Sequence, residues 1–442
     1  MPPAIATVVF ALGILGLFLL DRDRTPRVSP ALWIPVAWVF LAGSRMVSEW
    51  LEPARAMQSA DQYLEGSPLD RLVLTGLLAA GLAVLVARGP RAGTLLRANG
   101  PILFFFLYCV LSALWSDYPD VAFKRWTKAL GNFVMVLVVL TDPDPRAALK
   151  RVLARSGFLL IPLSVLLIKY YPDLGRGYGP WTWTPYYTGV STGKNGLGSV
   201  CLVFGLGTLW HFLEAVPGAE RANRARRLIA HGAVLAMVLW LFWRADSATS
   251  LACFLIGGGL LTLASLPRFA ARPTAAHILV GLLVFLSVLG FFFNLDSGVA
   301  EVLGRDTTLT GRTSLWAELL RTDVDRLFGA GFESFWLGER VEQFWRKYWW
   351  HPNQAHNGYL EIFLNLGWIG VALLGVVMVW GYRNVVGSFR LDSETARLRL
   401  AYFAAGAVYN LTEAAFKGIN VVWIAFLVAV TVVPEPSRRE VR

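Results

Sequence analysis

The sequence predicts an all-α integral membrane protein with about twelve or thirteen transmembrane helices and a capping extracytoplasmic loop. Of its 442 residues, 55% are hydrophobic and only 16% are charged, whereas soluble proteins carry about a quarter charged residues. The apolar residues form runs that approach the roughly 20 residues a helix needs to cross a bilayer. Aromatic residues flank many of these runs, as expected of side chains anchored at a membrane interface.

The candidate spans follow one another along the whole chain. They are residues 4–20, 31–44, 71–87, 98–115, 122–140, 152–169, 195–213, 228–243, 247–266, 276–293, 357–381, 398–412 and 418–433. The first run lacks a basic segment before it and a convincing cleavage motif after it, so we expect an uncleaved span. Several runs are short, and only a brief stretch with Glu413 and Lys417 separates the last two.

Charge predicts the side of the membrane that each connection faces. Lys and Arg concentrate in short connections, as the positive-inside rule expects of cytoplasmic segments. These connections are residues 21–27, 88–97, 142–151, 220–227, 267–273 and 383–399. Residues 45–70, 170–194 and 294–356 fall on the opposite, extracytoplasmic side. The basic loops also account for the net charge of +11, so we expect a lipid bilayer and no nucleic acid as partner.

Four regions follow from this topology. They are a transmembrane bundle (1–293), a large loop (294–356), C-terminal transmembrane helices (357–433) and a cytoplasmic tail (434–442). Loops of this length are usually functional or disordered. The loop is rich in tryptophan, unlike disordered segments, and residues 313–320 have the pattern of a short amphipathic helix. We therefore expect a small folded cap over the bundle.

Several classes of site are unsupported by the sequence. Cys109, Cys201 and Cys253 all lie inside apolar runs, so neither a disulfide framework nor a metal-type cysteine spacing is indicated. The motifs of phosphate loops, dinucleotide folds, zinc proteases and serine hydrolases do not occur. Nucleotide-driven transport and metalloproteolysis are therefore not predicted, and no cofactor is implied.

The segment HPNQAHNGYLEIFLNLGWIG (351–370) is the strongest candidate for a site. It places His351 and His356 where a long polar segment meets an apolar run, and polar groups at a membrane edge are functional candidates by default. His356 has the chemistry of an acid, a base or a phosphate contact. The alternative is a structural role beside Asn357, which suits a helix N-cap. Glu361 is a weaker candidate, and the histidines lack a third ligand for a metal.

Basic residues on the extracytoplasmic side form a second set of candidates because they break the positive-inside rule. They are Lys124, Arg125, Lys128, Lys194, Arg244 and Arg312. Arginine donates two parallel hydrogen bonds to phosphate, so a lipid-linked pyrophosphate would offset the cost of these charges. The alternative is that each cation pairs with a nearby acid such as Asp246.

Four segments carry a resemblance to a known family. They are STGKNGLG (191–198), GRTSLWAELL (311–320), LFGAGFESFW (327–336) and the histidine segment 351–370. In this order they are similar to the O-antigen ligase and polymerase family, integral-membrane glycosyltransferases that use undecaprenyl-pyrophosphate sugars. Residues 20–38, 65–71 and 113–132 resemble its exopolysaccharide-polymerase branch.

The resemblance implies a GT-C-like helical bundle in the bacterial inner membrane, with a periplasmic cap and a metal-independent, inverting transfer. Arg312 and His356 match the family's loop arginine and signature histidine. Many ligases have a Ser-Arg pair where this chain has DSATS (246–250). The second phosphate-binding cation is therefore Arg244, which lies close by, or else Lys124, Arg125 or Lys194.

The expected function is polymerisation of undecaprenyl-pyrophosphate-linked repeat units into exopolysaccharide, with chain-length regulators and export proteins as further partners. Two alternatives stay open. One is an O-antigen ligase that transfers glycan to lipid A or protein, because a family does not fix the acceptor. The other is a transporter or flippase, although the paired broken helices of many transporters are not evident.

Overall fold

The computed structural model describes residues 1–22, 28–52, 66–179, 183–215, 221–266, 308–389 and 392–434, together with Gly281. In this part of the chain, the regular structure is helical except for one short hairpin. The predicted all-α membrane fold is therefore confirmed. The predicted span 276–293, the basic loop 267–273, the start of the large loop and the tail after residue 434 lie outside the described residues.

The first half of the chain supplies one side of the bundle and a hairpin. Its elements are α1 (Pro3–Leu20), η1 (Pro30–Leu32), α2 (Trp33–Gly43), α3 (Val47–Leu51), α5 (Pro68–Ala87), α6 (Gly89–Ala98), α7 (Gly100–Leu111), η2 (Ser112–Trp115), α8 (Pro119–Leu140), α9 (Pro145–Tyr170), α10 (Pro172–Gly175), β1 (Arg176–Tyr178) and β2 (Pro185–Tyr187). Strands β1 and β2 are antiparallel, with Arg176 opposite Tyr187.

The second half contributes the remaining helices. They are α11 (Lys194–Ala215), α12 (Arg221–Ala245), α13 (Ala248–Ala264), α17 (Thr308–Leu319), α18 (Gly338–Lys347), α19 (Gly358–Ser388), α20 (Ser393–Thr412) and α21 (Val421–Val430). Helix α11 packs on α12 and α9, and α13 packs on α20. The predicted helix at residues 313–320 is present as the larger α17.

Local sequence determines where many helices begin. Proline occupies the first turn of α1, α5, α8 and α9, where its missing N–H costs nothing and its fixed φ suits a helix. Polar side chains also accept backbone N–H groups at helix starts: Ser67 caps α5, Asp144 caps α9 and Asn420 caps α21. Such caps satisfy backbone donors that have no partner within the helix.

Six of the described helices are long and apolar enough to cross a membrane, and the bent pair α6–α7 raises this number to seven. This is fewer than the twelve or thirteen spans predicted. Three of the predicted runs fold as shorter apolar helices, Pro30–Gly43, Ala248–Ala264 and Val421–Val430. Helices α8 and α20 cover two more runs but carry charged residues in their first turns.

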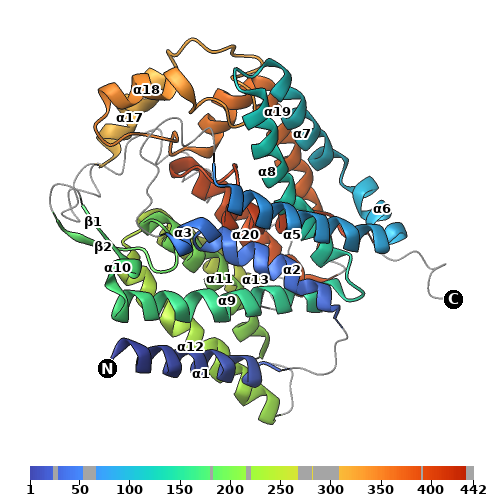
Figure 1. Ribbon diagram of the computed structural model, residues 1–442. Coiled ribbons are helices and arrows are strands. Elements are labelled where there is room, and N and C mark those ends of the chain that lie inside the picture. Colours follow the sequence, from blue (N-terminus) through green and yellow to red (C-terminus); the bar gives the residue numbers. More distant parts are fainter. Residues whose placement is uncertain are drawn as a thin grey trace.

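Two sets of contacts join connections that the charge pattern predicts to face the same side of the membrane. Arg45 donates to the carbonyls of Leu174, Gly189 and Val190, which joins two predicted extracytoplasmic segments. On the other side, Asp142 accepts from Arg88 at 2.9 Å. In Figure 1 the β1–β2 hairpin, α17 and α18 lie toward the left of the view, whereas α6 lies at the right.

The described part of the large loop, residues 308–356, is a folded cap. Its buried side chains include Leu315 of α17, Phe335, and Val341 and Phe344 of α18, which form one apolar cluster. The cap joins the bundle where α19 breaks at Gly367, with φ 63° and ψ −166°. The break frees backbone groups that bond to the turn before Gly329: Trp368 N–H donates to the Arg326 carbonyl at 2.9 Å.

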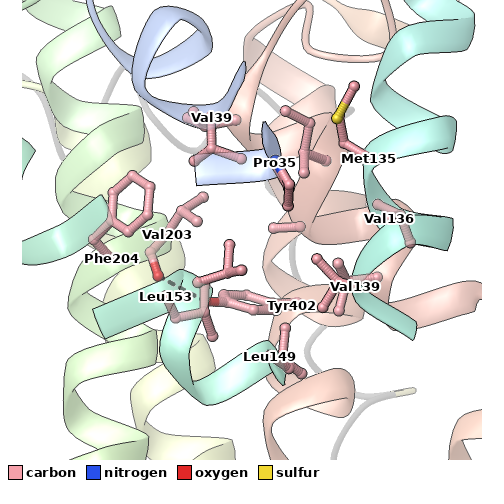
Figure 2. Close-up of a pocket in the computed structure, with 15 residues that line it drawn as sticks. Pro35, Val39, Met135, Val136, Val139, Leu149, Leu153, Val203, Phe204 and Tyr402 are labelled. Atoms are coloured by element: carbon pink, nitrogen blue, oxygen red, sulfur yellow. Dashed lines mark hydrogen bonds between the residues drawn. The ribbon is translucent and has the colours of Figure 1, made fainter. Parts of the chain in front are cut away.

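A small cavity of about 40 Å³ lies inside the bundle between α2, α8, α9, α11, α20 and α21 (Figure 2). Its lining is apolar apart from Tyr402, whose hydroxyl donates to the Val203 carbonyl at 2.9 Å. An apolar cavity of this kind stays dry. Because its lining includes no ionisable group apart from this bonded phenol, the cavity is a packing defect rather than a reaction site.

Candidate functional site

Glu413 is the centre of the best-formed polar cluster on the cap side. It follows the last residue of α20, and its side chain is 7% exposed. Its Oε1 lies 3.2 Å from Arg312 Nη2 and 2.9 Å from Asn195 Nδ2, and its Oε2 lies 3.2 Å from His356 Nδ1. Four separate regions of the chain therefore meet at one carboxylate, which we call the Glu413 site.

Arg312 reaches this site from α17 of the cap. Besides Glu413, its guanidinium donates to the Thr412 carbonyl at 2.6 Å. These contacts use part of the five N–H donors of a guanidinium, and a quarter of the side chain remains exposed. The arrangement holds a cation at the surface of the bundle without burying it, which suits a group that has to meet an anionic ligand.

His356 enters the site from the last residues of the cap. Its backbone has φ 49°, a left-handed conformation that non-glycine residues adopt only when the surroundings impose it. Its side chain is 20% exposed. Because Nδ1 faces the Glu413 carboxylate, the tautomer with hydrogen on Nδ1 is favoured and leaves the Nε2 lone pair as the acceptor.

The segment after His356 holds this residue in place. Asn357 caps α19 by accepting from Tyr359 and Leu360 N–H, and its Nδ2 donates to the Leu411 carbonyl at 3.0 Å. Glu361 is buried and accepts the Ala355 N–H at 2.8 Å. Both residues therefore lie beside the site as supports, which fits the weaker role expected of Glu361.

Lys194 lies next to Asn195 at the start of α11, so it borders the Glu413 site. Its Nζ is 3.9 Å from the Asp246 carboxylate, a loose ion pair between two exposed side chains. A bond of 2.8 Å between the hydroxyls of Thr249 and Thr412 attaches the start of α13 to the same region. The DSATS segment thus packs against the residue that precedes Glu413.

Arg244 ends α12 just before this segment. Its guanidinium stacks over Trp243 at 4.4 Å and over Tyr187 at 5.1 Å, and donates to the Tyr187 hydroxyl at 3.2 Å. Its Nε is buried and has no hydrogen-bond partner among the described residues. Aromatic faces stabilise a cation without neutralising it.

The other predicted residues lie elsewhere. The His351 ring stacks on Trp345 of α18, with ring centres 5.0 Å apart, so it belongs to the packing of the cap. Lys124, Arg125 and Lys128 of α8 line a separate pocket against α5, and none of the described residues of this pocket belongs to the Glu413 site. The single set of cations predicted from the sequence is thus divided in two.

Part of the Glu413 site lies in a segment that is similar to a known family. Residues 227–375 match the family model described as O-antigen ligase. The predicted family resemblance is therefore confirmed for this part of the chain, which includes Arg244, Arg312 and His356. The remainder of the Glu413 site lies outside the matched segment: Asn195 belongs to α11, and Glu413 follows α20.

A curated relative extends the similarity to more of the chain. It is the exopolysaccharide production protein ExoQ of Rhizobium meliloti (strain 1021), 26% identical over 291 residues. The match covers 64% of this chain and 64% of that protein. The chain thus spans a little under two thirds of the length of this relative.

The acidic residue at the centre of the site, Glu413, is not among the residues predicted from the sequence. The positive-inside rule singles out misplaced cations, and Glu413 stands in the sequence only as a residue between two apolar runs. An acid placed between two short apolar runs was itself a signal, since ionisable groups at a membrane edge are functional candidates. Asn195 gave no comparable signal.

Proposed function

We propose that this protein polymerises undecaprenyl-pyrophosphate-linked oligosaccharide repeat units into exopolysaccharide, on the periplasmic face of the inner membrane. The observation that carries the proposal is the meeting of Arg312 and His356 at Glu413, with both residues inside the segment that matches O-antigen ligase. The ExoQ relative, described as an exopolysaccharide production protein, supports the product class.

The cations are proposed to hold the leaving group. Arg312 has an exposed guanidinium at the site, and Arg244 has a buried Nε without a partner among the described residues. Together with Lys194 they can donate to the oxygens of a pyrophosphate, and charge-assisted bonds of this kind are roughly twice as strong as neutral ones. The cations also stabilise the negative charge that develops as the leaving group departs.

His356 is proposed to activate the acceptor. Glu413 holds Nδ1, so Nε2 takes the proton of an acceptor sugar hydroxyl as its oxygen attacks the anomeric carbon of the donor. The bond from that carbon to the pyrophosphate oxygen breaks, and undecaprenyl pyrophosphate leaves with the electron pair. Attack from the opposite face inverts the anomeric configuration. Pyrophosphate is a good leaving group, so the step requires no metal. The alternative to this role as a base is that His356 contacts the phosphate directly.

A ligase is the second candidate because the matching family model is described as O-antigen ligase. Such an enzyme would use the same donor and the same residues but deliver finished glycan to lipid A or to protein. Since the site geometry concerns the donor and the attacking hydroxyl, it supports both reactions. The acceptor decides between them, and it has to be tested directly.

The test is a reconstituted reaction with purified protein, lipid-linked repeat units and EDTA, with products separated by size on a gel. A ladder of products supports the polymerase. Products that form only after lipid A is added favour the ligase. His356→Ala and Arg312→Ala are each expected to abolish the ladder at normal protein levels. Arg321→Ala, an exposed arginine just after α17, is the control that keeps it. A full ladder from both site variants contradicts the mechanism.

A further inference from the structure

A basic pocket of about 290 Å³ lies between the first turns of α5 and α8, outside the Glu413 site. Four cations line it, Arg71 from α5 and Lys124, Arg125 and Lys128 from α8. The described lining contains no Asp or Glu. Asp70 and Glu333, which do not line the pocket, act electrostatically on Lys128. Four cations that converge on one cavity still offer charged N–H donors to an anionic ligand.

The pocket is also amphipathic. Arg71, Thr75 and Leu78 share one face of α5 because they follow at intervals of four and three residues. Leu74, Leu78 and the indole of Trp38 contribute apolar surface to the lining, as do Val121 and Phe123 of α8. Basic groups thus come first along α5 and apolar groups follow, deeper in the bundle. This order fits a molecule with an anionic head and a hydrocarbon chain.

The pocket is linked to the Glu413 site through one loop. Arg125 donates to the Glu333 carbonyl, and the Glu333 carboxylate accepts the Gly418 N–H. Asn132 of α8 also donates to the Gly418 carbonyl at 2.6 Å. Glu413 and Gly418 lie on the same short connection between α20 and α21. The two sites therefore hold opposite ends of this connection.

We propose that this pocket binds the pyrophosphate head of a second polyprenyl-linked substrate, the acceptor, while the Glu413 site holds the donor. The inference rests on the proposed function, because each polymerisation step joins sugars carried by two lipid pyrophosphates. Cations on α8 balance the second head, and the apolar lining contacts the start of its chain. The shared loop fixes the spacing between the two heads, so the acceptor sugar is presented to His356.

Binding stoichiometry tests this proposal without requiring turnover. The full chain in detergent is titrated with undecaprenyl pyrophosphate, and bound lipid is counted by native mass spectrometry. The wild type is expected to bind two molecules. Arg71→Gln/Lys128→Gln and Arg312→Gln are each expected to retain one. Arg91→Gln/Arg97→Gln removes two exposed charges from α6, away from both sites, and is the matched control that binds two.

The lost site should show a weakening of roughly tenfold to a hundredfold, because removing a charge-assisted bond costs about 1.5–3 kcal/mol. Two tight molecules bound by Arg71→Gln/Lys128→Gln overturn the proposal. So does equal displacement by phosphatidylglycerol, which would indicate a general site for anionic phospholipid. The single variant Lys128→Arg keeps the charge and should still bind two molecules. This control separates loss of the site from misfolding. Failure of the proposed function gives a different result: two lipids bind but wild-type protein forms no polymer.

Discussion

Replacing Glu413 by glutamine changes the charge at the centre of the site while keeping the size of the side chain. The carboxylate interacts with Arg312, Asn195 and His356 at 3.2, 2.9 and 3.2 Å. An amide offers one acceptor oxygen and two N–H donors in place of two acceptor oxygens. It therefore cannot accept from Arg312 and His356 on separate oxygens, and one of these charge-assisted contacts is lost.

The magnitude follows from that loss. A hydrogen bond to a charged group contributes about 1.5–3 kcal/mol, and each 1.36 kcal/mol added to the barrier slows the reaction tenfold. If the lost contact acts in the transition state, elongation slows by about tenfold to about a hundredfold. Arg312 keeps its bond to the Thr412 carbonyl, so it stays in the site. Glu413 acts here as a positioning residue for His356.

The assay compares initial rates of polymer elongation at saturating lipid-linked substrate for wild type, Glu413→Gln, His356→Ala and the double variant. A positioning role predicts non-additivity: Glu413→Gln costs much less in the His356→Ala background than in wild type. A purely structural role slows the reaction by the same factor in both backgrounds. Thermal unfolding in detergent measures stability in parallel, and Glu339→Gln on the exposed side of α18 is the charge-matched control.

The reasoning is refuted if Glu413→Gln elongates polymer within about twofold of the wild-type rate at unchanged stability, since one contact should cost at least tenfold. Additive losses in the double variant would refute the coupling between Glu413 and His356 but not the presence of Glu413 in the site.

Two further predictions concern stability. Gly367→Ala should destabilise the fold by about 1–3 kcal/mol or more, because the φ of 63° at this position strains any residue with a side chain. A Cβ there would also lie 2.2 Å from the carbonyl oxygen of Leu327. Gly375→Ala, in the same helix with open space around it, should leave the unfolding temperature unchanged or raise it. The cap should weaken in acid: burial raises the pKa of Glu318, but bonds from Lys347 and Tyr348 outweigh this and hold the pKa below the ordinary value of a glutamate. A lowered pKa means that this stabilisation is present above the unfolded pKa and is lost as pH falls through the folded value. Proteolysis of the cap between pH 6 and pH 3 should rise in the wild type and vary less in Glu318→Gln; equal curves would contradict this.

Much of the helical framework could be predicted from local patterns. Apolar runs predicted the long apolar helices because a bilayer selects for length and hydrophobicity, and proline marked several starts. The short or polar helices α3, α6, α10 and α18 were not predicted. Among the described residues, fewer helices are long and apolar enough to cross a membrane than the predicted number of spans, and α8 and α20 carry charged residues in their first turns. The cap was predicted from its aromatic content, and its core is formed by those aromatic residues together with aliphatic ones.

The candidate site could be predicted only in part. His356 and Arg312 stood out because polar residues at a membrane edge are costly, and their partner Glu413 was visible but not recognised. The cations of α8 could not be distinguished from Arg312 or Lys194, because all carry the same charge and the charge pattern predicts the same side of the membrane for all of them.

The sequence by itself determined the membrane class and the family resemblance and predicted the sidedness of the connections, because hydropathy, loop charge and short motifs are properties of local segments. Only the tertiary structure decided which ionisable groups meet. Asn195, Arg312, His356 and Glu413 are brought together by helices far apart along the chain, and Lys128 is directed into another pocket. Such meetings depend on how distant helices pack, and this information is not contained in any one segment.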